Sequence, residues 1–171
     1  MNQYGLCEKF SLLQRNSRQR LIPKPPPASS PQVAAVMRGN RGKNTRPELT
    51  LRSALWSAGL RGHRVNVGGL PGRPDIVVKR ARLAVFVHGC FWHRCPACNL
   101  PLPRANRDYW EAKLNRNVTR DLQNRANLED DGWVVIEVWE CELSTGASGI
   151  IQDVVSRITR QIGVMQIPSS S

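Results

Sequence analysis

The sequence has no apolar run long enough to cross a membrane. No segment approaches the roughly eighteen consecutive apolar residues that a membrane-spanning helix requires. A signal-peptide core is also missing near the N-terminus, because Glu8, Lys9, Gln14 and Arg15 interrupt the apolar residues there. We therefore expect a cytoplasmic protein with no membrane partner.

Acidic residues are scarce as well. The 171 residues include 13 Asp and Glu against 25 Lys and Arg, which gives a net charge of +12 at pH 7. This surplus exceeds what solubility requires and favours attraction to nucleic-acid phosphates, although basic tails and solvated basic faces also produce it. Between Arg38 and Arg73 the only acid is Glu48. We therefore expect a nucleic-acid-binding protein in which this isolated acid has a specific role.

Proline and glycine divide the chain into segments. The proline-rich run at residues 23–31 cannot form helix or sheet, so we interpret residues 1–32 as a disordered or weakly structured extension. Residues 33–44 are basic and interrupted by glycine, which suits either a DNA-contacting arm or an ordinary linker. Residues 45–163 are long enough for one domain with a core, and residues 164–171 would be a flexible tail.

The 45–163 region alternates helical and strand patterns. A helix begins at Thr45, with Pro47 in its first turn and Glu48 at the capping-box position, and it ends at Gly59. The later residues predict strands at 64–67, 76–78, 83–87 and 133–139, and helices at about 106–130 and 148–161. This order indicates an α/β fold with a mixed central sheet flanked by helices.

The long helix expected at 106–130 has two different faces. Its apolar stripe consists of Trp110, Leu114, Val118, Leu122 and Ala126. On another face lie Lys113, Asn117 and Arg120, which could contact DNA or simply solvent.

Four of the five cysteines have the spacing of metal ligands, namely Cys90, Cys95, Cys98 and Cys141. In a reducing compartment such a set favours metal binding over disulfides, and four thiolates suit zinc or an iron-sulfur cluster. We expect a structural Zn²⁺ site, in which His93 could replace one sulfur. A redox Cys-x-x-Cys pair and buried free cysteines are the alternatives. Cys7 is remote in the sequence and is interpreted as unrelated to this set.

Two neighbouring strands predict a phosphodiesterase site. Hydrolysis of a phosphodiester requires a metal and a base for the attacking water. Asp75 is a hard oxygen ligand at a strand start, and the next strand ends with the Val87 carbonyl and His88. This is the skeleton of the PD-(D/E)xK nucleases, but their later acid and lysine fall here at Phe86 and His88. A backbone carbonyl would have to replace the acid, and histidine the lysine.

His93 is the candidate general base in this stretch. Its ring could be held in one tautomer by Glu48. The capping-box position gives Glu48 an equally good structural explanation.

These motifs, taken in order, resemble a known family. The segments at 70–75, 88–93 and 138–141, together with Trp110 and the Lys113, Asn117, Arg120-Asp121 pattern, resemble the very-short-patch-repair DNA mismatch endonucleases. The resemblance covers about residues 37–143, and the His-Gly-Cys-Phe-Trp-His block at 88–93 is its most specific part. It implies a restriction-endonuclease-like fold, related to the PD-(D/E)xK nucleases, with a structural zinc site.

The resemblance also implies an activity. The protein would nick duplex DNA 5′ to the thymine of a T:G mismatch that arises when 5-methylcytosine deaminates. Mg²⁺ would be held by Asp75 and the carbonyl of Val87, with His88 and His93 at the scissile phosphate and Glu48 in support.

Further residues are implied to contact the DNA. The aromatic residues Phe91, Trp92 and Trp110 would intercalate beside the mismatch, and Met37 would enter from the minor groove. The remaining expected contacts are Arg38, Arg41, Lys43, Arg73, Lys113, Asn117 and Arg120. We expect a monomer associated with the nucleoid, and family members cooperate with a mismatch-repair matchmaker protein and a repair DNA polymerase.

Two other functions fit the same residues. The chain could be a non-catalytic, zinc-stabilised DNA-binding module in which Asp75 is only a turn residue, or a related nuclease with a different substrate. The aromatic residues could likewise pack around the zinc site instead of intercalating. Residues 94–98 also depart from the histidine-rich loop of some family members, which leaves the DNA contacts of that loop open.

Overall fold

The computed structural model describes residues 26–27, 31, 42–144 and 148–164. They form α3 (Arg46–Ser57), β1 (Arg64–Val65), β2 (Ile76–Val78), β3 (Leu83–His88), α4 (Arg107–Asp130), β4 (Val134–Trp139) and α5 (Ser148–Val164), with short 3-10 helices η1 (Lys79–Ala81) and η2 (Glu140–Leu143). The expected arm residues Met37, Arg38 and Arg41 lie outside the described residues. None of the described helices is long and apolar enough to cross a membrane.

The four strands form one mixed sheet in the order β1-β2-β3-β4. The β1–β2 and β2–β3 pairs are antiparallel, whereas β3 and β4 are parallel. The expected mixed α/β architecture is thus confirmed. β1 is shorter than predicted because Asn66 leaves the strand with a positive φ of 48°. β3 extends one residue further than predicted, and its last residue, His88, pairs with Trp139.

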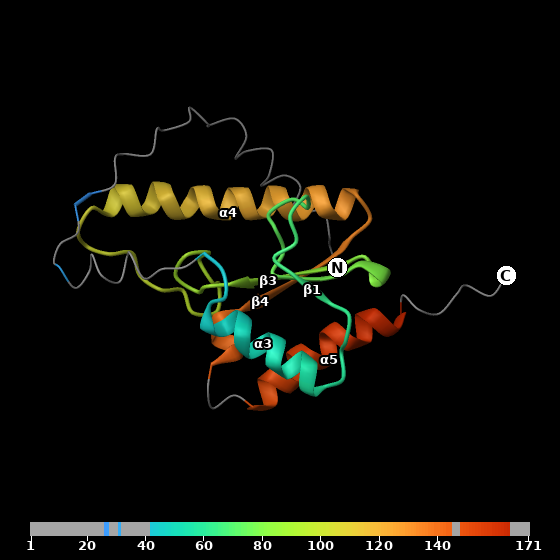
Figure 1. Cartoon of the computed structure of the whole chain (residues 1–171). Coiled ribbons are helices and arrows are strands. Elements are labelled where there is room, and N and C mark those ends of the chain that lie inside the picture. Colours follow the sequence, from blue (N-terminus) through green and yellow to red (C-terminus); the bar gives the residue numbers. More distant parts are fainter. Residues whose placement is uncertain (1–25, 28–30, 32–41, 145–147, 165–171) are drawn as a thin grey trace, which may run out of the picture.

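The helices cover the two faces of the sheet (Figure 1). Helix α4 lies across one face, while α3 and α5 lie together on the other. Leu51 and Leu55 of α3 and Ile158 of α5 are fully buried in the larger core, and Leu128 of α4 belongs to a smaller core on the opposite face. Because both faces are covered, β3 is apolar along almost its whole length, as predicted. Its C-terminal end is therefore held rigidly.

The predicted apolar stripe of α4 is buried only in part, and Leu114 is fully buried, as predicted. Leu122, expected in the apolar stripe, is 46% exposed, so that part of the prediction is wrong. The face turned inward carries Asn117, Asp121 and Asn124, which line a cleft between α4 and the sheet. The buried residues of α4 are Tyr109, Leu114 and Leu128, and Leu128 packs in the smaller core.

The loop between β1 and β2 packs closely against α4. Gly72 has a positive φ of 71°, and a Cβ at this position would lie 2.8 Å from Nδ2 of Asn124. The amide of Arg73 donates to the carbonyl of Leu70 at 3.1 Å, which closes the turn. The helix therefore fixes the backbone that leads into Asp75.

Gly72→Ala is expected to destabilise the protein more than Gly62→Ala. Both glycines have φ near +75°, so each alanine would incur a backbone penalty of about 1 kcal/mol. At Gly62 nothing lies within 4 Å of the added Cβ, whereas at Gly72 the Asn124 side chain must move. We expect an additional loss of about 1–3 kcal/mol for Gly72→Ala, measured by urea unfolding. Equal losses for the two variants would show that the loop does not rest on α4.

Candidate active site

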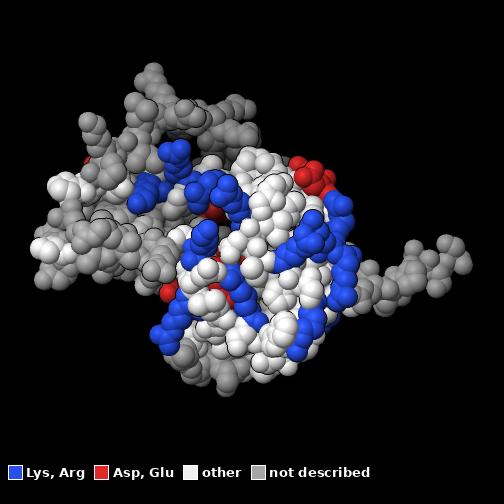
Figure 2. All heavy atoms as spheres, viewed as in Figure 1, with Lys and Arg blue, Asp and Glu red and all other residues white. Residues whose placement is uncertain are grey.

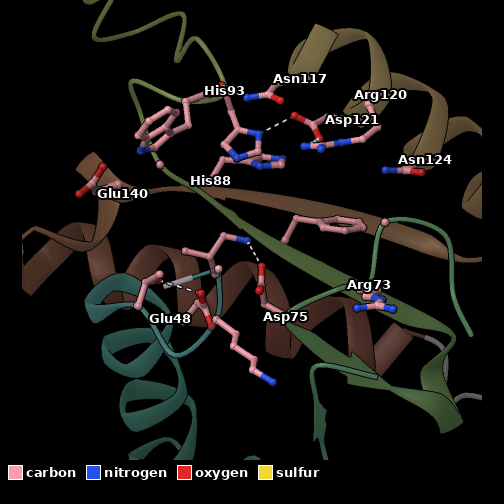
Figure 3. Close-up of a pocket in the computed structure, with 18 of the residues that line it drawn as sticks. Glu48, Arg73, Asp75, His88, His93, Asn117, Arg120, Asp121, Asn124 and Glu140 are labelled. Atoms are coloured by element: carbon pink, nitrogen blue, oxygen red, sulfur yellow. Dashed lines mark hydrogen bonds and ion pairs between the residues drawn. The ribbon is translucent and has the colours of Figure 1, made fainter. Parts of the chain in front are cut away.

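A cleft of about 1430 Å³ opens where β3 and β4 end. Its walls come from the start of α3, the β1–β2 loop, the end of β3 and the inward face of α4. Figure 3 shows polar side chains from these elements directed into one space. The predicted site residues that line it are Lys43, Glu48, Arg73, Asp75, Val87, His88, Trp92, His93, Trp110, Lys113, Asn117 and Arg120. Residues predicted from separate parts of the sequence thus share one cleft.

Asp75 stands at the start of β2 beside the end of β3. Its Oδ2 accepts a hydrogen bond of 2.7 Å from the backbone amide of Val87. Burial raises the pKa of Asp75 to about 6, and the negative charge of Glu48 adds to this, while the Val87 amide opposes it. Without a bound cation, the surroundings of Asp75 therefore disfavour the ionised form of its carboxyl group.

Asp75→Asn is expected to stabilise the metal-free protein at pH 8. The folded-state pKa of about 6 exceeds the ordinary value of 3.8, so the folded protein is destabilised by ionisation above pH 6 and regains this free energy as the pH falls toward 4. Asparagine keeps an oxygen that can accept the Val87 amide. We expect unfolding free energy to rise by about 1–3 kcal/mol at pH 8 and much less near pH 4. Urea unfolding at both pH values measures this, and a pH-independent difference would contradict the charge effect.

Glu48 lies buried at the start of α3 and has partners in and directly before that helix. Its carboxylate accepts hydrogen bonds from the Asn44 amide and the Thr45 hydroxyl, each at 2.8 Å, and from Arg52 at 2.9 Å. Thr45 is the N-cap residue, as predicted, but its hydroxyl donates to Glu48 instead of capping an amide. Glu48 faces the cleft from this network, and it does not hold the ring of His93.

The ring of His93 is held by Asp121 of α4. Nδ1 of His93 lies 2.5 Å from Oδ2 of Asp121, and the two side chains point toward one another in Figure 3. Burial opposes ionisation of Asp121, but the hydrogen bond and charge of His93 outweigh it and keep its pKa below the usual value. Asp121 is thus a site residue that the sequence interpretation did not assign.

A second histidine lies against the first. The ring centroids of His88 and His93 are 4.3 Å apart. Nε2 of His88 lies 3.6 Å from Oε1 of Glu137 on β4, so this histidine also has a carboxylate partner. His93 groups with His88 and Asp121 and does not join the cysteines, so it does not replace one of their sulfurs.

The aromatic residues form a cluster at one end of the cleft. The ring of Phe91 contacts those of Trp92 and Trp110 edge-on, with centroids 5.3 and 5.7 Å away. Nζ of Lys113 lies 5.2 Å from each tryptophan ring, and Nδ2 of Asn117 donates to the Trp92 carbonyl at 3.1 Å. The polar face of α4 therefore positions the cluster. Phe91 itself is not part of the cleft lining.

The four predicted cysteine ligands lie together beside the cleft. Sγ atoms of Cys90, Cys95, Cys98 and Cys141 all lie within 4.8 Å of one another, and none forms a disulfide. Burial raises the pKa of Cys90, and that of Cys141 to about 11. Burial also opposes ionisation of Cys95, but amide hydrogen bonds from Cys98 and Ala97 outweigh it and lower its pKa. Without a bound cation, the four cysteines are therefore not all ionised at neutral pH.

Basic side chains surround the opening. Figure 2 shows Lys and Arg gathered over the visible face of the molecule, with few acids among them. Lys43 reaches the cleft from the segment before α3, and Arg73 reaches it from the loop before β2. Arg120, whose side chain is 59% exposed, reaches it from α4. This distribution suits a polyanion better than a small neutral ligand.

The comparisons with known proteins agree with one another. The family model described as "DNA mismatch endonuclease Vsr" matches residues 29–99. The Type II nicking enzyme V.XorIIP of Xanthomonas oryzae pv. oryzae is 48% identical over 110 residues, which cover 64% of this chain and 79% of that protein. V.NmeAIP, the Type II nicking enzyme of Neisseria meningitidis, is 39% identical over 127 residues, covering 74% and 89%. The DNA mismatch endonuclease Vsr of Escherichia coli (strain K12) is 40% identical over 107 residues, covering 63% and 68%.

A mixed α/β fold with an acid, two histidines and a basic rim in one cleft has the composition of a DNA endonuclease. The chain belongs to the Vsr family of DNA endonucleases, as its relatives show. The resemblance inferred from the motifs is therefore confirmed at the level of the family.

Proposed function

We propose that this chain nicks duplex DNA 5′ to the thymine of a T:G mismatch produced by deamination of 5-methylcytosine, and that hydrolysis depends on Mg²⁺. The observation that carries the proposal is the single cleft that joins Asp75 to two carboxylate-paired histidines beside an aromatic cluster. A relative named as a mismatch endonuclease supports the substrate, and relatives named as nicking enzymes support cleavage of one strand.

The proposal includes the class of fold and the organisation of the chain. Asp75 followed by the antiparallel β2–β3 pair supports a restriction-endonuclease-like fold related to the PD-(D/E)xK nucleases. Residues 45–163 would form the endonuclease domain, and residues 33–44 would contact DNA through Met37, Arg38, Arg41 and Lys43. The basic charge of that segment supports a phosphate contact.

The residues around Asp75 fit a hard divalent cation. A partly buried carboxylate whose charge is disfavoured by burial and by Glu48 would be stabilised by a cation, and oxygen ligands are those that Mg²⁺ prefers. Asp75 and the carbonyl of Val87 would hold the ion. When bound, it would supply positive charge at the scissile phosphate.

His93 is the proposed general base. With Nδ1 donating to Asp121, its Nε2 is left as the nitrogen that can accept a proton from the attacking water. Asp121 has a lowered pKa and therefore stays ionised at neutral pH, where it would stabilise the imidazolium that forms. His88 would lie at the scissile phosphate. Glu48 would support the site through its negative charge near Asp75.

We propose that the cysteines hold one structural Zn²⁺. The Sγ atoms of Cys95 and Cys141 are 3.9 Å apart. Sulfurs at about 2.3 Å from a tetrahedral zinc lie about 3.8 Å from each other, while a disulfide requires about 2.05 Å. The donor set therefore fits zinc with all four ligand positions filled, which is the arrangement of a structural site.

The aromatic cluster is the proposed mismatch sensor. Unstacking a base step costs a few kcal/mol and less at a mismatch, so an inserted wedge selects weakly paired sites. Phe91, Trp92 and Trp110 already contact one another and would insert as a unit, with Lys113 and Asn117 beside them. Arg73 and Arg120 on the rim would contact phosphates.

A nicking assay on end-labelled duplexes tests the proposal. Three substrates that differ only at one position, with a T:G mismatch, a T:A pair or a single strand, are incubated with the protein and Mg²⁺. We expect one cut, 5′ to the mispaired thymine, and little cleavage of the other two. Equal cleavage of the paired duplex would refute mismatch specificity, while no cleavage of any substrate would favour a binding module.

A further inference from the structure

The environment of His88 is completed by β4. The parallel register pairs Phe86 with Glu137 and His88 with Trp139, so these four side chains share the α4 face of the sheet. His88 is buried, and its ring is stacked with Phe86 at 6.0 Å and tilted against Trp139 at 5.2 Å. The neighbouring rings restrict how far the imidazole can move, and Glu137 is the acid that reaches it.

Each oxygen of Glu137 has its own partner. Oε1 lies 3.6 Å from Nε2 of His88, and Oε2 accepts a hydrogen bond of 3.2 Å from Arg125 of α4. Arg125 also donates to Glu129 at 2.8 Å, on the exposed side of the helix. The His88 contact and then Arg125 lower the pKa of Glu137 against the effect of burial. Glu137 is therefore an ionised group fixed between α4 and His88.

We propose that Glu137 is the positioning residue of His88: it keeps a proton on Nε2 and so leaves Nδ1 as the nitrogen that accepts a hydrogen bond from a water molecule in the cleft. This inference rests on the proposed nuclease function and deepens it. His88 lines the cleft, and among the described residues its Nδ1 has no hydrogen-bond partner. A ring held at one nitrogen presents the other in a fixed direction.

The register explains why this acid stands on β4. The position of the later acid in the PD-(D/E)xK skeleton is occupied here by Phe86, and Glu137 is the residue paired with Phe86 on the neighbouring strand. A carboxylate is thus present at that level of the sheet, one strand away. It contacts His88 and not Asp75, so its role is to orient a histidine.

The two histidines consequently have independent supports. Asp121 on α4 holds His93, and Glu137 on β4 holds His88, although the two rings lie only 4.3 Å apart. Loss of Glu137 should disturb His88 and leave the hydrogen bond between His93 and Asp121 in place. Separate carboxylates allow the His93 ring to accept a proton while the His88 ring keeps its tautomer.

Glu137→Gln and Glu129→Gln form a matched pair for the kinetic test. Both acids bind Arg125, but only Glu137 contacts His88. We expect Glu137→Gln to lower the single-turnover nicking rate on a T:G duplex roughly 10- to 100-fold, the usual effect of losing an orienting partner. Its DNA Kd should be unchanged, and Glu129→Gln should behave as wild type. A rate for Glu137→Gln equal to that of Glu129→Gln would overturn the inference.

Nitrogen NMR of the full-length zinc-loaded protein supplies a readout that does not depend on cleavage. The chain has 3 histidines, so His63→Gln and His93→Gln variants together assign the His88 ring signals. We expect the Nε2–H form of His88 in wild type and a mixture with the Nδ1–H form in Glu137→Gln, with His93 unchanged. An Nδ1–H form in the wild type would overturn the inference, even if the variant failed to fold.

The two readouts separate this inference from the proposed function. If the wild type cuts none of the duplexes, the proposed function fails, while the NMR still decides whether Glu137 fixes the His88 tautomer. If the wild type nicks the mismatch and both glutamine variants do so equally, the positioning role fails and the nuclease function stands.

Discussion

Asp75→Asn is expected to reduce single-turnover nicking of a T:G duplex at least about 10³-fold, because charge stabilisation by a metal contributes several kcal/mol to such transition states. The substitution keeps the size of the side chain and an acceptor for the Val87 amide, but it removes the anionic ligand. DNA affinity should change little, since the basic rim remains. A quenched-flow nicking assay in Mg²⁺, with fluorescence anisotropy for binding, measures the two effects separately.

Asp108→Asn is the matched control for this substitution. Asp108 is an exposed acid in the first turn of α4 and does not line the cleft, so the same chemical change there should leave nicking intact. Since Asp75→Asn is also expected to stabilise the metal-free protein at pH 8, unfolding cannot account for its lost activity. Equal cleavage by wild type and Asp75→Asn would remove Asp75 from the mechanism.

The secondary structure followed from local signals where these were strong. Helix α4 begins and ends within one residue of the predicted range 106–130, and β3, apolar up to His88, matches a central strand with both faces covered. Such signals depend on residues close together in the chain, so they can be recognised in a single sequence. The inward face of α4 was harder to predict, because it combines the buried Leu114 and Leu128 with polar residues that line the cleft. Leu122 of the predicted stripe is exposed.

The partners of the two histidines could not be predicted from spacing. Asp121 is 28 residues from His93, and Glu137 reaches His88 only because β4 returns parallel to β3 after the whole of α4. A register between parallel strands joined by a long helix is not encoded in either strand alone. Glu48 illustrates the opposite case, since its spacing suggested a cap and its partners Asn44, Thr45 and Arg52 are indeed local.

The four cysteines of the cluster could be predicted from the sequence, because few other residue types serve as zinc ligands. The Cys95–Cys98 spacing marked two members, and the closeness of Cys90 and the position of Cys141 after a strand suggested the others. The structure brings all four together. The loop between β3 and α4 contains turns but no helix or strand, so the cysteine cluster and the contacts of Asn117 and Asp121 together restrain the segment that carries Trp92 and His93.

Cys141→Ser is therefore expected to cause the largest loss of stability. Cys141 joins the end of β4 to the 90–98 loop, where its Sγ lies 3.9 Å from that of Cys95 across 46 residues of chain. If zinc fills the cluster, loss of one ligand should cost roughly 3–5 kcal/mol of the binding free energy that supports folding. For a domain of this size that corresponds to a Tm lowered by roughly 10 °C. Nicking should fall as well, because the loop that carries His93 loses one of its attachments to the domain.

Cys7→Ser provides the control, because Cys7 is remote from the cluster in the sequence and is expected to leave zinc content and Tm unchanged. Metal analysis of the purified protein should find about one zinc ion per chain in the wild type and in Cys7→Ser, and much less in Cys141→Ser. Differential scanning calorimetry supplies the three Tm values. A wild type without zinc, together with a Cys141→Ser variant of unchanged Tm, would mean that packing alone holds the loop, since the thiols would then contribute no crosslink between β3 and β4.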